Sequence, residues 1–146
     1  MATASEHARK VSSLVQEFAR QIVNYRLPEP VTEHCFATVV KRRHRFDFCW
    51  PDFMTAVECD GFKVESVYVR AGHVQRVITT GHGTPVQLQD DAFKRNMAAM
   101  LGWTVLVFHQ NAIDRGDAIA MTQRVLVAKG WKPRHAVPSV LADQPF

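Results

Sequence analysis

Cysteine is scarce in this sequence, and its spacing excludes the sites that cysteine usually builds. The 146 residues contain three cysteines, Cys35, Cys49 and Cys59, which is an odd number without a Cys-x-x-Cys pair. A disulfide framework needs paired cysteines, and a zinc ribbon needs closely spaced ones. We therefore expect all three to be small buried residues of a protein that stays in a reducing compartment.

Long apolar runs are also missing. No stretch approaches the roughly 20 apolar residues that cross a membrane, and residues 1–10 lack the pattern of a secretory signal. Internal repeats and low-complexity tracts are absent as well. These absences favour a soluble protein of the cytoplasm.

The length suits one domain with its own core. We assign residues 1–130 to that domain and residues 131–146, which contain Pro133, Pro138 and Pro145, to a C-terminal tail. The formal net charge of +4 and the pI near 9.2 permit nucleic-acid binding without demonstrating it.

Three segments predict helices. Apolar residues recur at helical spacing through residues 5–25, and Pro28 then stops the helix. A second helix is expected to begin with Asp90 as its N-cap and to end at Gly102. Four apolar residues should form its inner side: Phe93, Met97, Met100 and Leu101. A last helix should be capped by Asp114 or Asp117 and run to Lys129, before Gly130.

The intervening segments predict strands. We expect an edge strand at residues 34–40, a strand at 43–50, a tight turn at 51–54 and a strand at 55–60. Residues 64–69 and 74–80 predict a further hairpin or flap, inserted at residues 63–80. Residues 103–109 predict a fully buried strand, since their apolar run is uninterrupted, and a crossover should bring it beside the earlier sheet. The order predicts an α/β (α+β) fold in which helices flank a central mixed sheet.

Two acidic clusters, about ten residues apart, fall on the two arms of the expected hairpin. A tight register places Asp47 directly opposite Glu58, with β-carbons about 4.5–5.5 Å apart. Because side chains alternate along a strand, Asp60 shares the face of Glu58, whereas Val57 and Cys59 take the other. Three converging carboxylates indicate that a cation or a proton occupies the gap between them. Mg²⁺ suits such a site, because it is a hard ion held by a few carboxylates together with substrate phosphate.

The alternative is an acidic strand face that is simply solvated. The flanking residues argue against it. Phe46, Phe48 and Trp50 alternate with Asp47, so the carboxylates lie on strands that pack into a core. A charge at the rim of a core is costly unless it has a partner.

A basic run leads directly into the Asp47 strand. Strand alternation places Arg43 and Arg45 on the carboxylate face, and Arg42 precedes them. These side chains could contact phosphates beside a scissile bond, or they could offset the acidic cluster electrostatically. Further basic residues could extend the same surface: Arg70, Arg76, Lys94 and Arg95. No helix with a base-reading pattern is evident, which favours recognition of DNA shape over base readout.

Three segments together resemble small endonucleases of the PD-(D/E)xK superfamily. They are residues 45–51 (RFDFCWP), 56–61 (AVECDG) and 91–103 (DAFKRNMAAMLGW). The resemblance is to phage-encoded and bacterial proteins akin to Holliday-junction resolvases and very-short-patch-repair nucleases, and it spans roughly residues 33–125 in order. It implies a restriction-endonuclease-like core with the element order α-β-β-β-α-β.

The resemblance also implies a metal site. Asp47 matches the first metal-binding aspartate of the family, and Glu58 matches the acidic residue of its (D/E)-x-K element. The backbone carbonyl of Cys59 would be the third ligand. Asp60 stands where the family usually has lysine, as in subfamilies with Glu-x-(Asp/Glu)-Gly, and is a further candidate ligand. Glu17 on the first helix is an additional candidate, because a helix glutamate completes the metal shell in several resolvases.

The displaced lysine has two candidates. Lys94 is the first, since it lies on the helix that flanks the cleft in such folds, and Lys63 is the second. A solvated helix surface is the alternative role for Lys94. His82 resembles the histidine of a Gly-Arg-His loop in related phage proteins, although the arginine is absent here; its alternative role is that of a surface loop residue. Both Lys63 and His82 would then contact DNA.

The function implied is Mg²⁺-dependent hydrolysis of DNA phosphodiester bonds, with Mn²⁺ as a substitute. Branched DNA is the expected substrate, as for a Holliday-junction resolvase in recombination and repair. Because symmetric cutting of two strands needs two active sites, a homodimer is expected. A bacterial or phage-infected cell is the expected location. Two alternatives stay open: a mismatch-directed nicking endonuclease of the very-short-patch-repair type, and a non-catalytic DNA-binding protein that retains a nuclease fold.

Overall fold

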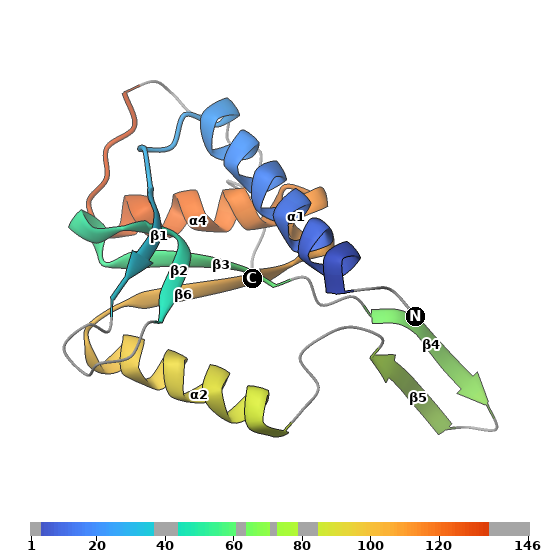
Figure 1. Cartoon of the computed structure of the whole chain (residues 1–146). Helices are drawn as coiled ribbons and strands as arrows, with labels where there is room; N and C mark the ends of the chain where they lie inside the picture. The colour runs from blue at the N-terminus through green and yellow to red at the C-terminus, as the bar shows by residue number, and fades with distance from the viewer. Residues whose placement is uncertain (1–3, 37–43, 61–63, 71–72, 79–84, 135–146) are drawn as a thin grey trace.

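The computed structural model describes residues 4–36, 44–60, 64–70, 73–78 and 85–134. Over these ranges the chain has an α+β fold, in which helices cover both faces of a four-stranded mixed sheet (Figure 1). A separate two-stranded hairpin projects beyond one end of that sheet (Figure 1). The expectation of a mixed sheet flanked by helices is therefore confirmed.

Four strands form the main sheet in the order β1-β2-β3-β6. Their bounds are β1 Val31–Cys35, β2 Arg45–Trp50, β3 Thr55–Asp60 and β6 Thr104–His109. The first three are antiparallel neighbours, and β6 lies parallel to β3, as the predicted crossover requires. The turn between β2 and β3 is the short 3₁₀ helix η2 (Pro51–Phe53), after which Met54 takes a left-handed conformation with φ +46°.

Two groups of helices pack on opposite faces of the sheet. The helices α1 (Ala4–Asn24), α3 (Gln110–Asp114) and α4 (Asp117–Ala128) share one core with the sheet, whereas α2 (Pro85–Met100) covers the other face (Figure 1). Phe18 of α1 is fully buried, and its ring lies 5.4 Å from that of Phe48 and 6.2 Å from that of Phe108. Such aromatic pairs add to the free energy gained by burial.

The first helix and the first strand differ in how well they were predicted. The helix predicted at residues 5–25 is confirmed as α1. The edge strand predicted at residues 34–40 instead begins at Val31, directly after Pro30, because the extended chain that follows the prolines pairs with β2 at once. Residues 37–40 of that prediction lie outside the described residues.

The hairpin predicted around residues 64–80 is confirmed as β4 (Val64–Arg70) and β5 (His73–Ile78), which pair antiparallel. It is inserted between β3 and α2. The elements α1, β1, β2, β3, α2 and β6 otherwise follow the order α-β-β-β-α-β.

The second helix starts earlier than predicted. Its first helical residue is Pro85, whereas a start just after Asp90 was predicted. The first position of a helix accepts proline, because its N–H would have no intrahelical partner. Its end near Gly102 was predicted correctly. Gly102 has φ +85°, and the N–H of Trp103 donates to the carbonyl of Ala98, so the chain reverses into β6.

The inner side of α2 was predicted wrongly in part. Met97 is buried, but Phe93, Met100 and Leu101 are exposed, and Met100 is 80% accessible. The helix turns its Lys94–Ala98 face to the sheet instead. The strand β6 was expected to be fully buried, yet most of its residues are half-buried, since it is an edge strand with β3 as its neighbour.

The last helix was predicted with the wrong cap. Gly116, with φ +80°, is the N-cap of α4, and no side chain caps it. Asp114 instead ends the short helix α3 and accepts hydrogen bonds from Gln110. The predicted end is confirmed, since Lys129 is the C-cap of α4.

Candidate functional site

The β2–β3 hairpin brings the two acidic clusters together. Phe48 pairs with Val57, Cys49 with Ala56 and Trp50 with Thr55. Extending this register would place Asp47 opposite Glu58, as predicted, but the regular pairing ends at Phe48 and Val57. Val57 and Cys59 pack into the core shared with α1 and α4, so alternation along β3 leaves Glu58 and Asp60 on the α2 side.

Asp47 departs from regular strand geometry. Its Oδ2 accepts a hydrogen bond of 2.8 Å from the main-chain N–H of Cys59, where a regular ladder would use a backbone carbonyl. Phe46 and Asp47 both line one cavity, although consecutive residues of a regular strand point to opposite faces. On the neighbouring strand, Glu33 has φ +53°. The sheet is thus distorted at the level of Asp47. Because Phe48 packs on the α1 side, alternation alone already places Asp47 on the α2 side, and it is Phe46 that the distortion turns toward α2.

A cavity of about 240 Å³ opens between the sheet and α2, and we call it the acidic cavity. Its lining consists of Phe46, Asp47, Glu58, Cys59, Asp60, Asp91, Lys94, Arg95, Ala98, Val105 and Val107. The four lining residues of α2 are Asp91, Lys94, Arg95 and Ala98, whose spacing of three, four and seven positions places them on one helical face. Four carboxylates and two cations therefore meet in one hollow.

Lys94 is bound to Glu58 in this cavity. Its Nζ lies 2.5 Å from Oε1 of Glu58, and the two side chains are 21% and 22% exposed. The ring centroid of Phe46 is 6.0 Å from the same nitrogen. The ion pair therefore lies in the wall of the cavity. A merely solvated lysine would instead lie on an open helix surface.

Burial shifts both central carboxyls in the same direction. Desolvation raises the pKa of Asp47 above its ordinary 3.8, against the opposing effects of the Cys59 N–H and of Lys94. Desolvation also raises the pKa of Glu58 above its ordinary 4.5, although Lys94 lowers it. The charge of Asp47 raises the pKa of Glu58 further, and the charges of Glu33 and Asp60 raise that of Asp47. The cavity therefore disfavours negative charge, so a cation bound there would be favoured.

The donors suit a hard divalent ion only in part. In the part of the chain that the structure describes, no three carboxylate, histidine or cysteine side chains are gathered closely enough to enclose a metal ion. Mg²⁺, however, is commonly held by one or two carboxylates while water and substrate phosphate complete its shell. Asp47 and Glu58, with the carbonyl of Cys59, would be such an incomplete set, which is compatible with that mode of binding.

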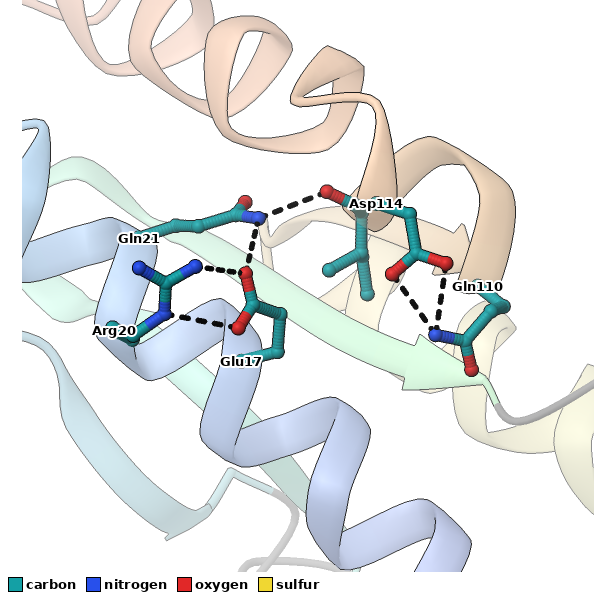
Figure 2. Close-up of polar contacts among 6 residues, drawn as sticks. Glu17, Arg20, Gln21, Gln110 and Asp114 are labelled. Atoms are coloured by element: carbon teal, nitrogen blue, oxygen red, sulfur yellow. Dashed lines mark hydrogen bonds and ion pairs between the residues drawn. The ribbon is translucent and has the colours of Figure 1, made fainter.

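Glu17 lies elsewhere. It sits on α1, on the face of the sheet opposite to α2, and it is not among the residues that line the acidic cavity. Figure 2 shows its carboxylate bound to Arg20, at 2.6 and 3.0 Å, and to the amide of Gln21. Gln21 also donates to the carbonyl of Ile113 and thereby joins α1 to α3. The structure thus gives Glu17 a role in holding the helices and does not bring it to the other candidate ligands.

The candidate DNA-binding residues differ in their position relative to the acidic cavity. Arg95 lines the acidic cavity. Arg45 is exposed, does not line it, and has its guanidinium 3.9 Å from the Glu33 carboxylate. Arg70 and Arg76 belong to the hairpin of β4 and β5. Four further candidates, Arg42, Arg43, Lys63 and His82, lie outside the described residues.

The three cysteines are free thiols. Cys49 and Cys59 are buried, and burial raises the pKa of the Cys49 thiol to about 11 and raises that of Cys59 still further. Both thiols are therefore protonated at neutral pH and unsuited to nucleophilic or metal chemistry. The expectation that the cysteines are buried is confirmed for Cys49 and Cys59, but it is wrong for Cys35, which is only partly buried.

Sequence reasoning missed five residues that line the cavity, namely Phe46, Asp91, Ala98, Val105 and Val107. Asp91 lies one turn before Lys94, and this spacing was a signal that could have been used, because it puts both on one helical face. Phe46 carried no such signal. Strand alternation predicts that it faces away from Asp47, and only the distortion of the sheet turns it toward Lys94.

Comparison of the chain with protein-family models, curated proteins and solved structures found no match. Among the described residues, no helix has the length and apolar character to cross a membrane.

Proposed function

We propose that this chain is a metal-dependent endonuclease that hydrolyses phosphodiester bonds in DNA, built on a restriction-endonuclease-like core. One observation carries the proposal. Asp47 and Glu58 lie on neighbouring strands, and the lysine that the resemblance had singled out, Lys94, reaches Glu58 from the facing helix. Two desolvated carboxylates beside an ammonium group, in the lining of the acidic cavity, are groups suited to metal-assisted phosphodiester hydrolysis.

The roles follow from the positions. Asp47, Glu58 and the Cys59 carbonyl would hold Mg²⁺, with Asp60 beside them. When bound, the ion would polarise the scissile phosphate and lower the pKa of a water molecule to give the attacking hydroxide. Lys94 would stabilise the negative charge that develops on the phosphate, because its ammonium group already points into the cavity. The N–H of Cys59 holds Asp47 in orientation.

DNA would approach across the α2 side of the sheet. Arg95 lies within the cavity, and a basic run, residues 41–45, directly precedes Asp47 in the sequence. The hairpin of β4 and β5 follows β3 and carries Arg70 and Arg76 (Figure 1). Basic side chains such as Arg95, beside an acidic centre, would bind phosphates next to the scissile bond. Branched DNA and a homodimer remain the preferred substrate and assembly.

The test is a cleavage assay on four labelled substrates: a four-way junction, a flap, a mismatched duplex and a plain duplex. Each is incubated with Mg²⁺, Mn²⁺ or EDTA, and Asp47→Ala is the control. We expect paired, metal-dependent cuts confined to the junction. Nicking at the mismatch by a monomer would instead indicate the repair-type enzyme. Binding without cleavage of any substrate would contradict the proposal and leave a DNA-binding protein with a nuclease-like fold.

A further inference from the structure

The ammonium group of Lys94 occupies a position for which a metal ion would have to compete. Its Nζ lies 2.5 Å from Oε1 of Glu58, one of the two carboxylates expected to bind the ion. The lining of the acidic cavity has four carboxylates against two cations, which leaves a formal excess of two negative charges. That excess equals the charge of one divalent ion, so the cavity is balanced only after the ion has bound.

We propose that Lys94 keeps metal out of the DNA-free site, and that a DNA phosphate admits metal by drawing this ammonium group away from Glu58. The inference rests on the proposed function, because it takes Glu58 to be a metal ligand. Metal and DNA then bind cooperatively. By linkage, each raises the affinity for the other by the same factor.

The exchange of partners needs both ligands. A phosphate can replace the carboxylate as the partner of a lysine, which binds phosphate as a point charge. Once Lys94 has left, Glu58 is a desolvated carboxylate without its counter-ion, and such a group is costly. A divalent ion removes that cost. Phosphate alone and metal alone are thus each bound less favourably than the two together.

The surroundings of Lys94 allow its side chain to move while its backbone stays in place. Met97 and Ala98, one turn further along α2, are buried against the sheet and anchor the helix. The lysine stem is flexible. The ring of Phe46, 6.0 Å from Nζ, is 1% exposed and stacks on Phe36, so it offers the ammonium group a fixed aromatic face.

The test measures binding rather than cleavage. Ca²⁺ is titrated calorimetrically into wild type, Lys94→Gln and Arg95→Gln, each alone and with saturating four-way-junction DNA. Intact DNA on a denaturing gel afterwards verifies that no turnover contributed. Arg95→Gln is the matched control, because it removes the same charge from the lining of the same cavity, one residue away.

We expect DNA to raise the Ca²⁺ affinity of wild type at least about fivefold, within the usual range of coupling between sites. Lys94→Gln should bind Ca²⁺ at least about fivefold more tightly than wild type without DNA and should lose most of the effect of DNA. Arg95→Gln should keep that effect. Lys94→Arg, which retains the charge, should resemble wild type and serves as the second variant if Lys94→Gln does not fold.

Two results would overturn the inference, and they differ in what else they overturn. Equal gains in Ca²⁺ affinity in Lys94→Gln and Arg95→Gln would mean that the field of the cavity, not the contact with Glu58, controls the ion. The nuclease proposal would survive that result. If Ca²⁺ binds none of the proteins, with or without DNA, the metal site itself is wrong and both proposals fail.

Discussion

The carboxylate of Asp47 accepts a hydrogen bond from the main-chain N–H of Cys59, at 2.8 Å, across the β2–β3 hairpin. A side chain therefore occupies the place of a backbone acceptor at the point where the sheet is distorted. The contact fixes the direction of the carboxylate, and it also fixes the peptide group that precedes Cys59. One candidate ligand, the carboxylate of Asp47, is thus oriented by the main chain.

This contact separates two substitutions of Asp47. Asp47→Asn keeps an oxygen that can accept the N–H bond, whereas Asp47→Ala leaves a part-buried donor without its partner. We expect Ala to cost about 1–3 kcal/mol of unfolding free energy, and Asn to cost less or to stabilise, since it removes a desolvated charge. Urea denaturation at neutral pH measures both. A larger loss in Asn than in Ala would contradict the geometry.

Cleavage should respond differently from stability. Asp47→Ala, Asp47→Asn and Glu58→Ala should each abolish metal-dependent cleavage, because a neutral side chain is a poor ligand for a hard cation. DNA binding, measured by fluorescence anisotropy in EDTA, should stay largely intact. Retained cleavage in both alanine variants would remove the basis for the assignment.

The raised pKa values of the two carboxyls predict how stability depends on pH. A carboxyl whose folded-state pKa lies above its unfolded value is favourable below the unfolded value, and its contribution is lost as the pH rises through the folded pKa. The ordinary pKa values are 3.8 for Asp47 and 4.5 for Glu58. In EDTA, wild type should therefore lose unfolding free energy relative to Asp47→Asn as the pH rises from about 4 to 7. The opposite slope would show that the Cys59 N–H and Lys94 together outweigh desolvation at Asp47.

Lys94 has a predicted role in the chemical step. Lys94→Ala should slow single-turnover cleavage about 10²–10³-fold, the loss typical of a removed charge-stabilising donor, without weakening metal binding. Arg20→Ala is a suitable control, because Arg20 lies on α1, across the sheet, paired with Glu17. An unchanged rate in Lys94→Ala would move the catalytic cation elsewhere, and Lys63 would be tested next.

The hairpin at the centre of the site could be predicted from the sequence because its signals are local. Alternating aromatic residues define β2, the proline turn fixes the register, and the period of two fixes the faces of Val57 and Glu58. Short-range geometry of this kind depends on few residues. The bounds of β3 were accordingly predicted correctly, as was the placement of β6 beside it.

The face of α2 that lines the acidic cavity was predicted less accurately than the hairpin, because it depends on how the helix is rotated about its axis. Apolar content suggested that Phe93, Met100 and Leu101 face inward, yet the helix presents the side that carries Asp91 and Lys94. An open cavity lets charged residues occupy an inner face, so hydrophobic pattern alone gives the wrong rotation. The inward turn of Phe46 depends on the distorted sheet and has no sequence signal.

Arg95 should contribute to DNA affinity through charge. Arg95→Gln should weaken binding to all DNA substrates and reduce the slope of log affinity against log salt by about 1, as expected for one phosphate contact. Arg20→Gln, on the other face of the sheet, should leave the slope unchanged. Anisotropy titrations at several salt concentrations provide the measurement. Equal slopes for both variants and wild type would place the DNA on another surface.

The role of Glu17 that the family resemblance implies differs from the role that the structure shows. By resemblance it would be a metal ligand, and its loss would abolish cleavage. In the structure its carboxylate binds Arg20 and Gln21 on the far side of the sheet, and the hydrogen bond from Arg20 lowers its pKa (Figure 2). We therefore expect Glu17→Gln to leave both Ca²⁺ affinity and the cleavage rate within about twofold of wild type, since surface ion pairs contribute little. A loss of Ca²⁺ affinity comparable to that of Glu58→Ala would show that α1 reaches the metal after all, and that the acidic cavity is only one wall of a larger site.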